Sequence, residues 1–127
     1  MVKKILIVEN NLLLSMINKR YCEYLGHQVI DSVMTGAAAI ESAKKNKPDV
    51  IIMDIRIDGD IDGIETMLEI KKFSNVKAIY VTGNSEAAMK QKAETTNMLA
   101  FCVKPTSFED IKEILERDDF QPPVYHL

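Results

Sequence analysis

The stretch Val50-Ile51-Ile52-Met53-Asp54 is the most informative segment of this chain, because four consecutive apolar residues end in a single carboxylate. Such a run is typical of a strand that is buried on both faces of a parallel sheet. Asp54 is then expected where the buried strand meets solvent. Ligands bind at the carboxyl ends of the strands in open parallel sheets. We therefore predict that Asp54 is the reactive group of the protein.

Apolar, β-branched runs alternate with segments of helical periodicity on both sides of this stretch. The predicted strands are Lys4–Val8, Gln28–Met34, Val50–Met53, Val76–Val81 and Leu99–Val103. The predicted helices cover residues 12–25, 36–46, 64–73, 85–95 and 108–117. The first helix carries apolar residues at helical spacing, namely Leu12, Leu13, Met16, Ile17, Tyr21, Tyr24 and Leu25. Ser107 and Asp110 form the capping box that opens the last helix.

Five strand–helix units in succession predict an α/β fold, in which a parallel sheet is covered by helices on both faces. The flavodoxin-like order 2-1-3-4-5 is the economical choice, so we expect a (βα)5 three-layer sandwich. The second strand has few apolar residues and is expected at an edge. The pattern stops after Arg117. We therefore predict one domain over residues 1–117, followed by a polar, Pro-containing tail or start of a linker over 118–127.

The composition and net charge of the chain limit the classes of function that it can have. The chain has 127 residues, of which 46% are apolar and 28% charged, as expected for one globular domain. A net charge of −3 argues against direct nucleic-acid binding, which needs clustered Lys and Arg. The apolar run Ile5–Val8 is too short for a signal peptide or a membrane span, so we expect a cytoplasmic protein. Cys22 and Cys102 lie in no metal or redox motif and are interpreted as small buried hydrophobes.

Four of the predicted strands end in polar residues. The first strand is followed by Glu9 and Asn10, the third ends in Asp54, the fourth in Thr82 and the fifth in Lys104. Each of these residues alone would also fit a cap, a turn or a strand end. In the order 2-1-3-4-5 the first and third strands are neighbours, so Glu9 and Asn10 are expected beside Asp54. The convergence of all of them on one edge predicts a site.

The chemistry of this set favours phosphoryl transfer. Carboxylate and carbonyl oxygens form a site for a hard cation such as Mg²⁺, which keeps some waters and binds an incoming phosphoryl group. Asp54 would be the nucleophile that forms an acyl phosphate. Lys104 would neutralise phosphoryl oxygens, and the Thr82 hydroxyl would donate a hydrogen bond to one of them.

In these residues the chain resembles the receiver domain of two-component response regulators, from about Val2 to Arg117. The resemblance implies that Asp54 takes a phosphoryl group from a phosphohistidine on a sensor histidine kinase or phosphotransfer protein. It implies self-phosphorylation and autodephosphorylation that depend on Mg²⁺ (or Mn²⁺), without the turnover of a classical enzyme. The metal ligands would be Glu9, Asn10, Asp54 and the backbone carbonyl of Arg56.

The same resemblance assigns a switch. Thr82 would move toward the phosphoryl group and Phe101 would turn inward, which changes the surface of the fourth helix, fifth strand and fifth helix toward an output protein or domain. A homodimer is also compatible with it. Arg56 and Asn84 would tune the phosphoryl lifetime. The Lys104-Pro105 peptide bond would be cis, as the weak trans preference before proline permits.

Two departures from the family pattern stand out. Asn10 replaces the acidic residue that normally binds the metal directly. We therefore predict weaker Mg²⁺ binding and slower phosphorylation, because one formal charge is missing. The loop after Asp54 is one residue longer than usual and lacks the family's Pro, with Asp62-Gly63 closing it.

Two alternatives remain beside phosphotransfer. The first is a receiver-like interaction module that works without phosphorylation, which Asn10 suggests. The second is a calcium loop, since Asp58 to Glu69 fits the spacing of an EF-hand loop. The strand-like segment before the loop and Glu65 at its eighth position do not match that motif's context.

Overall fold

The computed structural model describes residues 1–83, 87–117 and 121–127. The strands are β1 (Lys4–Val8), β2 (Gln28–Val33), β3 (Val50–Asp54), β4 (Lys77–Thr82), β5 (Met98–Val103) and β6 (Val124–His126). The helices are α1 (Leu12–Tyr24), α2 (Gly36–Asn46), α3 (Gly63–Lys71), α4 (Ala87–Ala93) and α5 (Phe108–Leu115). Within this described part, no helix combines the length and apolar character that crossing a bilayer requires.

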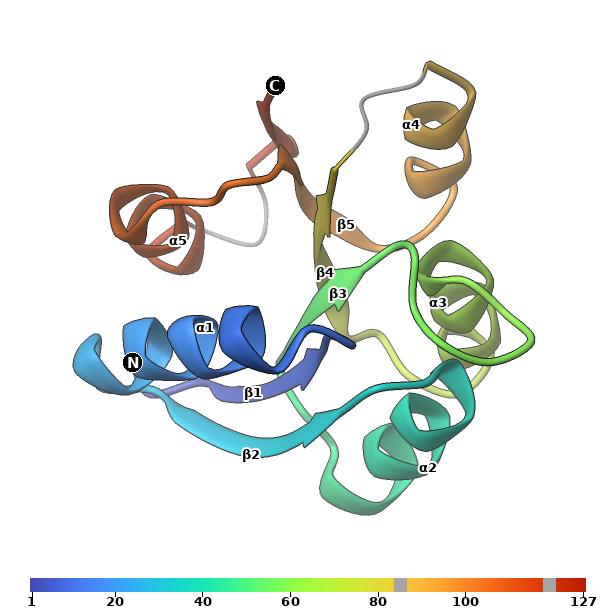
Figure 1. The fold of residues 1–127 in the computed structure, drawn as a ribbon, viewed down its shortest axis with the longest axis horizontal. Coiled ribbons are helices and arrows are strands. Elements are labelled where there is room, and N and C mark those ends of the chain that lie inside the picture. The colour runs from blue at the N-terminus through green and yellow to red at the C-terminus, as the bar shows by residue number, and fades with distance from the viewer. Residues whose placement is uncertain (84–86, 118–120) are drawn as a thin grey trace.

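All strand pairs are parallel, and the sheet order is β2-β1-β3-β4-β5-β6 (Figure 1). Helices α1 and α5 cover one face, where they share a core with β1, β3, β4 and β5. Helices α2, α3 and α4 cover the other face. The predicted three-layer fold and the order of its first five strands are confirmed, with β2 at an edge.

The segment predicted as a polar tail or the start of a linker contains a sixth strand. Residues Val124–His126 form β6, which pairs in parallel with β5 and thus continues the β5–α5 unit by one more strand. The open edge of β5 presents backbone groups that a further strand can pair with. Val124 and Tyr125 have high strand propensity. A segment of three strand residues after a polar stretch was too short to reveal this pairing from sequence.

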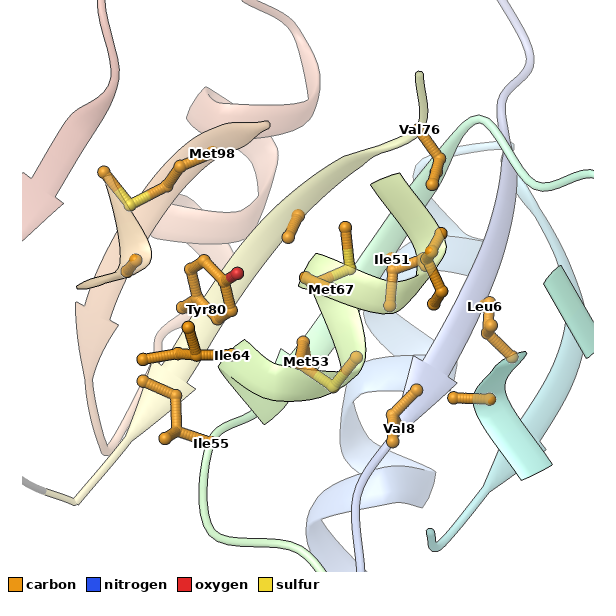
Figure 2. Packing of buried hydrophobic residues seen from close by; sticks show 14 of the residues in the cluster. Leu6, Val8, Ile51, Met53, Ile55, Ile64, Met67, Val76, Tyr80 and Met98 are labelled. Atoms are coloured by element: carbon orange, nitrogen blue, oxygen red, sulfur yellow. The ribbon is translucent and has the colours of Figure 1, made fainter. Parts of the chain in front are cut away.

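The core on the α3 side is shown in Figure 2. Ile51 and Met53 of β3 point toward Ile64 and Met67 of α3, and all four side chains are at most 3% exposed. Ile52, between them in sequence, belongs to the core on the opposite face. The strand is therefore buried on both faces, as its continuous apolar run predicted.

Helix α1 does not bury all of the apolar residues that recur along it at helical spacing. Leu12, Leu13, Met16 and Tyr24 are exposed, whereas the buried residues of the helix are Ser15, Asn18 and Cys22. These three small or polar positions allow α1 to lie close to the sheet. The Ser15 hydroxyl is satisfied there by a 2.6 Å hydrogen bond with Ser32 of β2.

The loop between β3 and α3 is held tightly against the end of β3. The Gly63 amide donates to the Ile55 carbonyl at 2.7 Å, and Asp62 forms a capping box with Glu65 at the start of α3. A Cβ atom on Gly63 would lie 2.3 Å from the Asp54 carbonyl oxygen, so only glycine fits. The loop is therefore anchored directly beside Asp54.

Candidate functional site

The carboxyl ends of β1, β3 and β5 bring three charged side chains together. Lys104 Nζ lies 3.0 Å from Glu9 Oε1 and 2.9 Å from Asp54 Oδ2. Glu9 is 3% exposed and Asp54 is 5% exposed. Val8 and Met53 are register partners in adjacent strands, which explains why Glu9 and Asp54 meet although they are distant in sequence. The structure thus forms the charged cluster that the strand order predicted.

Burial and the second carboxylate alter the acidity of this cluster. Burial raises the pKa of Asp54 to about 6, with the Lys104 hydrogen bond opposing the shift and Glu9 adding to it. Burial acts to lower the pKa of Lys104, but its hydrogen bonds with Asp54 and Glu9 outweigh this and raise it. The Lys104 ammonium therefore stays charged between two carboxylates that it only partly neutralises.

Asn10 is oriented by an acidic partner that sequence reasoning did not identify. Its Nδ2 donates to Asp58 Oδ1 at 3.1 Å, and Asp58 itself pairs through a backbone bridge with Thr35. Because a carboxylate only accepts hydrogen bonds, this contact assigns the amide nitrogen of Asn10 to the Asp58 side. The sequence does show Asp58 as an acidic residue in the lengthened loop. Nothing in the sequence linked Asp58 to Asn10, however.

The remaining predicted residues lie around this cluster. The Arg56 amide donates to Asp54 Oδ1 at 3.2 Å, while its side chain is exposed. Thr82 is fully buried; its hydroxyl contacts Met89 Sδ at 4.0 Å, and its carbonyl accepts from the Lys104 amide at 2.7 Å. The Lys104-Pro105 peptide bond is cis, as expected. Asn84 lies outside the described residues.

Phe101 is buried in this structure, in the middle of β5. Its ring centroid lies 6.4 Å from that of Tyr80 on β4 and 6.5 Å from that of Tyr125 on β6. The predicted switch aromatic is therefore packed between the neighbouring strands, and one of its two aromatic neighbours comes from the C-terminal segment.

The donor set fits a hard cation better than a transition metal. Glu9 and Asp54 supply carboxylates, and Asn10 supplies an amide oxygen, which are ligand types that Mg²⁺ accepts while keeping waters. Within the described ranges, no group of three or more His, Cys, Asp or Glu side chains is arranged to hold a metal ion. Glu9 and Asp54 are the two carboxylates among the proposed metal ligands.

Three residues of the calcium-loop alternative make other contacts in this structure. Asp62 caps α3, Asp58 accepts from Asn10, and Glu69 lies within α3 in an ion pair with Lys72.

Both Cys22 and Cys102 are free and buried, as interpreted from sequence, and burial raises the pKa of each thiol to about 12.

Comparison with known proteins agrees with this geometry. The model of the response regulator receiver domain matches residues 5–116. The chain belongs to this family. Receiver domains of response regulators pair with sensor kinases and output domains, and they generally bind Mg²⁺ at the acidic phosphorylation site.

Individual relatives cover most of the receiver domain described here. The chemotaxis protein CheY of Thermotoga maritima is 30% identical over 116 residues, which are 91% of this chain and 96% of CheY. The transcriptional regulatory protein PdtaR of Mycobacterium tuberculosis is 27% identical over 114 residues, which are 90% of this chain but 55% of PdtaR. The chain therefore spans about half the length of that relative.

The fold also matches solved receiver structures. The signal receiver domain of a modulated diguanylate cyclase from Desulfovibrio desulfuricans G20 superimposes with a TM-score of 0.84 at 26% identity, covering 91% of this chain and 92% of that domain.

Proposed function

We propose that this receiver domain is a phosphoacceptor that takes a phosphoryl group onto Asp54 from a phosphohistidine of a sensor histidine kinase or phosphotransfer protein. The observation that carries the proposal is the placement of buried Asp54 between Lys104 and Glu9 at the carboxyl edge of the sheet. A carboxylate in contact with a mobile cation can become a nucleophile whose phosphorylated product is neutralised locally.

The chain's own residues divide the chemistry. A carboxylate oxygen of Asp54 attacks phosphorus, and the bond to the imidazole nitrogen breaks with its electron pair returning to the ring. The Arg56 amide holds Asp54 in place by its 3.2 Å hydrogen bond. The Lys104 ammonium then pairs with the negatively charged phosphoryl oxygens. The Thr82 hydroxyl donates a hydrogen bond to one of these oxygens. Hydrolysis of the acyl phosphate later resets Asp54.

Glu9, Asn10, Asp54 and the carbonyl of Arg56 would hold Mg²⁺ or Mn²⁺. When bound, the ion supplies charge neutralisation for the incoming phosphoryl group. The Asp58 contact supports a role for Asn10 in this set, because an amide whose nitrogen is occupied by Asp58 keeps its oxygen available as a ligand. Asn10 thus replaces the charge of the usual acidic residue with an oriented dipole.

The output is a changed surface on α4, β5 and α5 that an output protein or domain recognises. Lys104 follows β5 directly, and its amide donates to the Thr82 carbonyl. Lys104 therefore links Thr82 to the strand that carries Phe101, the other proposed switch residue. A displacement of Lys104 toward a phosphoryl group would pull on this strand. This links the reacting carboxylate to the proposed output surface.

The test is phosphorylation of the full chain with acetyl phosphate and Mg²⁺, followed by intact-protein and peptide mass spectrometry. The expected result is one phosphoryl adduct on the peptide that contains Asp54. The adduct should be absent in Asp54→Asn, and also in the unmodified chain when a chelator removes the Mg²⁺. Asp58→Asn serves as a matched acid-to-amide control that keeps the nucleophile. A chain that stays unmodified under these conditions would instead favour the phosphorylation-independent interaction module.

A further inference from the structure

The edge of β5 that faces away from β4 is covered by the chain's own C-terminal strand. β6 runs parallel to β5, with Phe101 opposite Tyr125 and Cys102 opposite His126. In Figure 1 the C-terminal end, in dark red, lies beside β5 between α5 and α4. The strand thus occupies the middle of the surface proposed above as the output surface.

Side-chain contacts attach β6 to both flanking helices. The Tyr125 ring packs against Phe101. Burial, together with the neighbouring Glu94 carboxylate that directly follows α4, raises the pKa of the Tyr125 hydroxyl. His126 Nδ1 lies 3.4 Å from Asp110 Oδ1 on α5. β6 therefore places an aromatic ring over Phe101 and polar groups near the carboxylates of Glu94 and Asp110.

The attachment of β6 is small compared with that of the inner strands. β6 has three residues, of which Tyr125 is 40% exposed and none is fully buried. Phe101, by contrast, is fully buried beneath it. Segments with few buried contacts open at a lower free-energy cost than the core. Opening of β6 would expose an apolar strand edge, and such edges pair with strands from other chains.

We propose that the β5 edge is a strand-accepting docking surface, and that a partner protein binds it by adding an extended segment parallel to β5 in place of β6. The partner segment carries an aromatic residue over Phe101 and donor or basic side chains toward Glu94 and Asp110. This inference names the partner chemistry of the output surface, and its signalling role rests on the proposed function. The binding itself requires no phosphorylation.

A competition experiment on the full chain tests the proposal. The probe is a fluorescently labelled synthetic peptide with the sequence of residues 121–127, and its binding is measured by fluorescence anisotropy. The tethered β6 competes at an effective concentration on the order of millimolar, so binding to the unmodified chain is weak. Tyr125→Ala weakens the tethered strand, and the peptide is expected to bind this variant at least tenfold more tightly.

Two controls make the result specific. Leu127→Ala changes an exposed residue beyond β6 and should leave peptide binding as in the unmodified chain. A peptide with alanine in place of its tyrosine should lose binding to the Tyr125→Ala chain. Hydrogen exchange over residues 98–103 should become faster in Tyr125→Ala and slow again when the peptide binds.

Equal peptide affinity for the unmodified and Tyr125→Ala chains would overturn the proposal, as would unchanged exchange over β5. Exchange of β6 between two copies, detected as a dimer by light scattering in place of peptide binding, would overturn it in favour of self-association. Failure of Asp54 to accept a phosphoryl group would refute the proposed function only, because the peptide experiment is performed without phosphorylation.

Discussion

Exchanging the amide of Asn10 and the carboxylate of Asp58 separates the effect of charge on metal binding from its effect on stability. In the unmodified chain, Asn10 Nδ2 donates to Asp58 Oδ1 at 3.1 Å. Asn10→Asp places two acceptor-only carboxylates face to face. Asp58→Asn removes the acidic partner of the amide. The double variant Asn10→Asp/Asp58→Asn restores one amide–carboxylate hydrogen bond with its direction reversed.

The magnitudes follow from Coulomb's law at this exposed position. Two unit charges about 4 Å apart in water interact by about 1 kcal/mol, so Asn10→Asp should lower the metal-free free energy of unfolding by about that amount. A divalent ion gains about twice as much from the new carboxylate, which corresponds to on the order of tenfold to thirtyfold tighter Mg²⁺ binding. The double variant should gain metal affinity without losing stability, because its two side chains again form a hydrogen bond.

The assays are isothermal titration with Mg²⁺ at fixed ionic strength and urea denaturation in the presence of a chelator. Phosphorylation by acetyl phosphate at subsaturating Mg²⁺ should become faster in the same order as the affinities. Mg²⁺ binding that is no tighter in Asn10→Asp than in the unmodified chain would refute the argument that the missing charge weakens the site. A double variant as unstable as Asn10→Asp would refute the role given to the contact with Asp58.

Three further predictions concern stability. Asp54→Asn should raise the metal-free free energy of unfolding at pH 7.5 by about 1–2 kcal/mol after allowance for solvent screening, because burial raises the pKa of Asp54 to about 6. The folded carboxyl keeps its proton at a higher pH than the unfolded one, so the gain should shrink as pH falls from 6 toward 4; a gain independent of pH would contradict this origin. Gly63→Ala should cost about 2–3 kcal/mol in urea denaturation because its Cβ would meet the Asp54 carbonyl, whereas Gly83→Ala, with nothing within 4 Å, is the matched control. Tyr80→Phe should cost about 1 kcal/mol by removing the buried 2.7 Å hydrogen bond to Thr96, and an unchanged melting temperature would argue against that bond.

The strand–helix alternation and the charged ends of the strands were predictable from local pattern. The run Val50–Met53 is apolar at every position, and a strand between two helix layers is the structure that buries all of them. Placing Glu9 beside Asp54 required only the strand order, because the ends of adjacent parallel strands meet. The capping box of Ser107 and Asp110 is likewise local, and the structure confirms it.

Helix α1 shows where local pattern was insufficient. Its periodicity indicated a helix correctly, but the buried side is set by which residues allow close packing on β1 and β2. Ser15 and Asn18 are buried, whereas Leu12 and Met16 face solvent. Hydrophobicity alone ranks these residues in the opposite order. The exposed apolar residues thus became visible as a surface only in the folded chain.

Sequence alone therefore established the family-like order of Glu9, Asp54, Thr82 and Lys104, because each of these residues follows or ends a recognisable strand. The tertiary structure alone brought Asp58 to Asn10 and β6 to β5. Both contacts join segments across loops, where spacing carries no periodic signal and the partner is selected by geometry. These contacts determine how Asn10 is oriented and what covers Phe101.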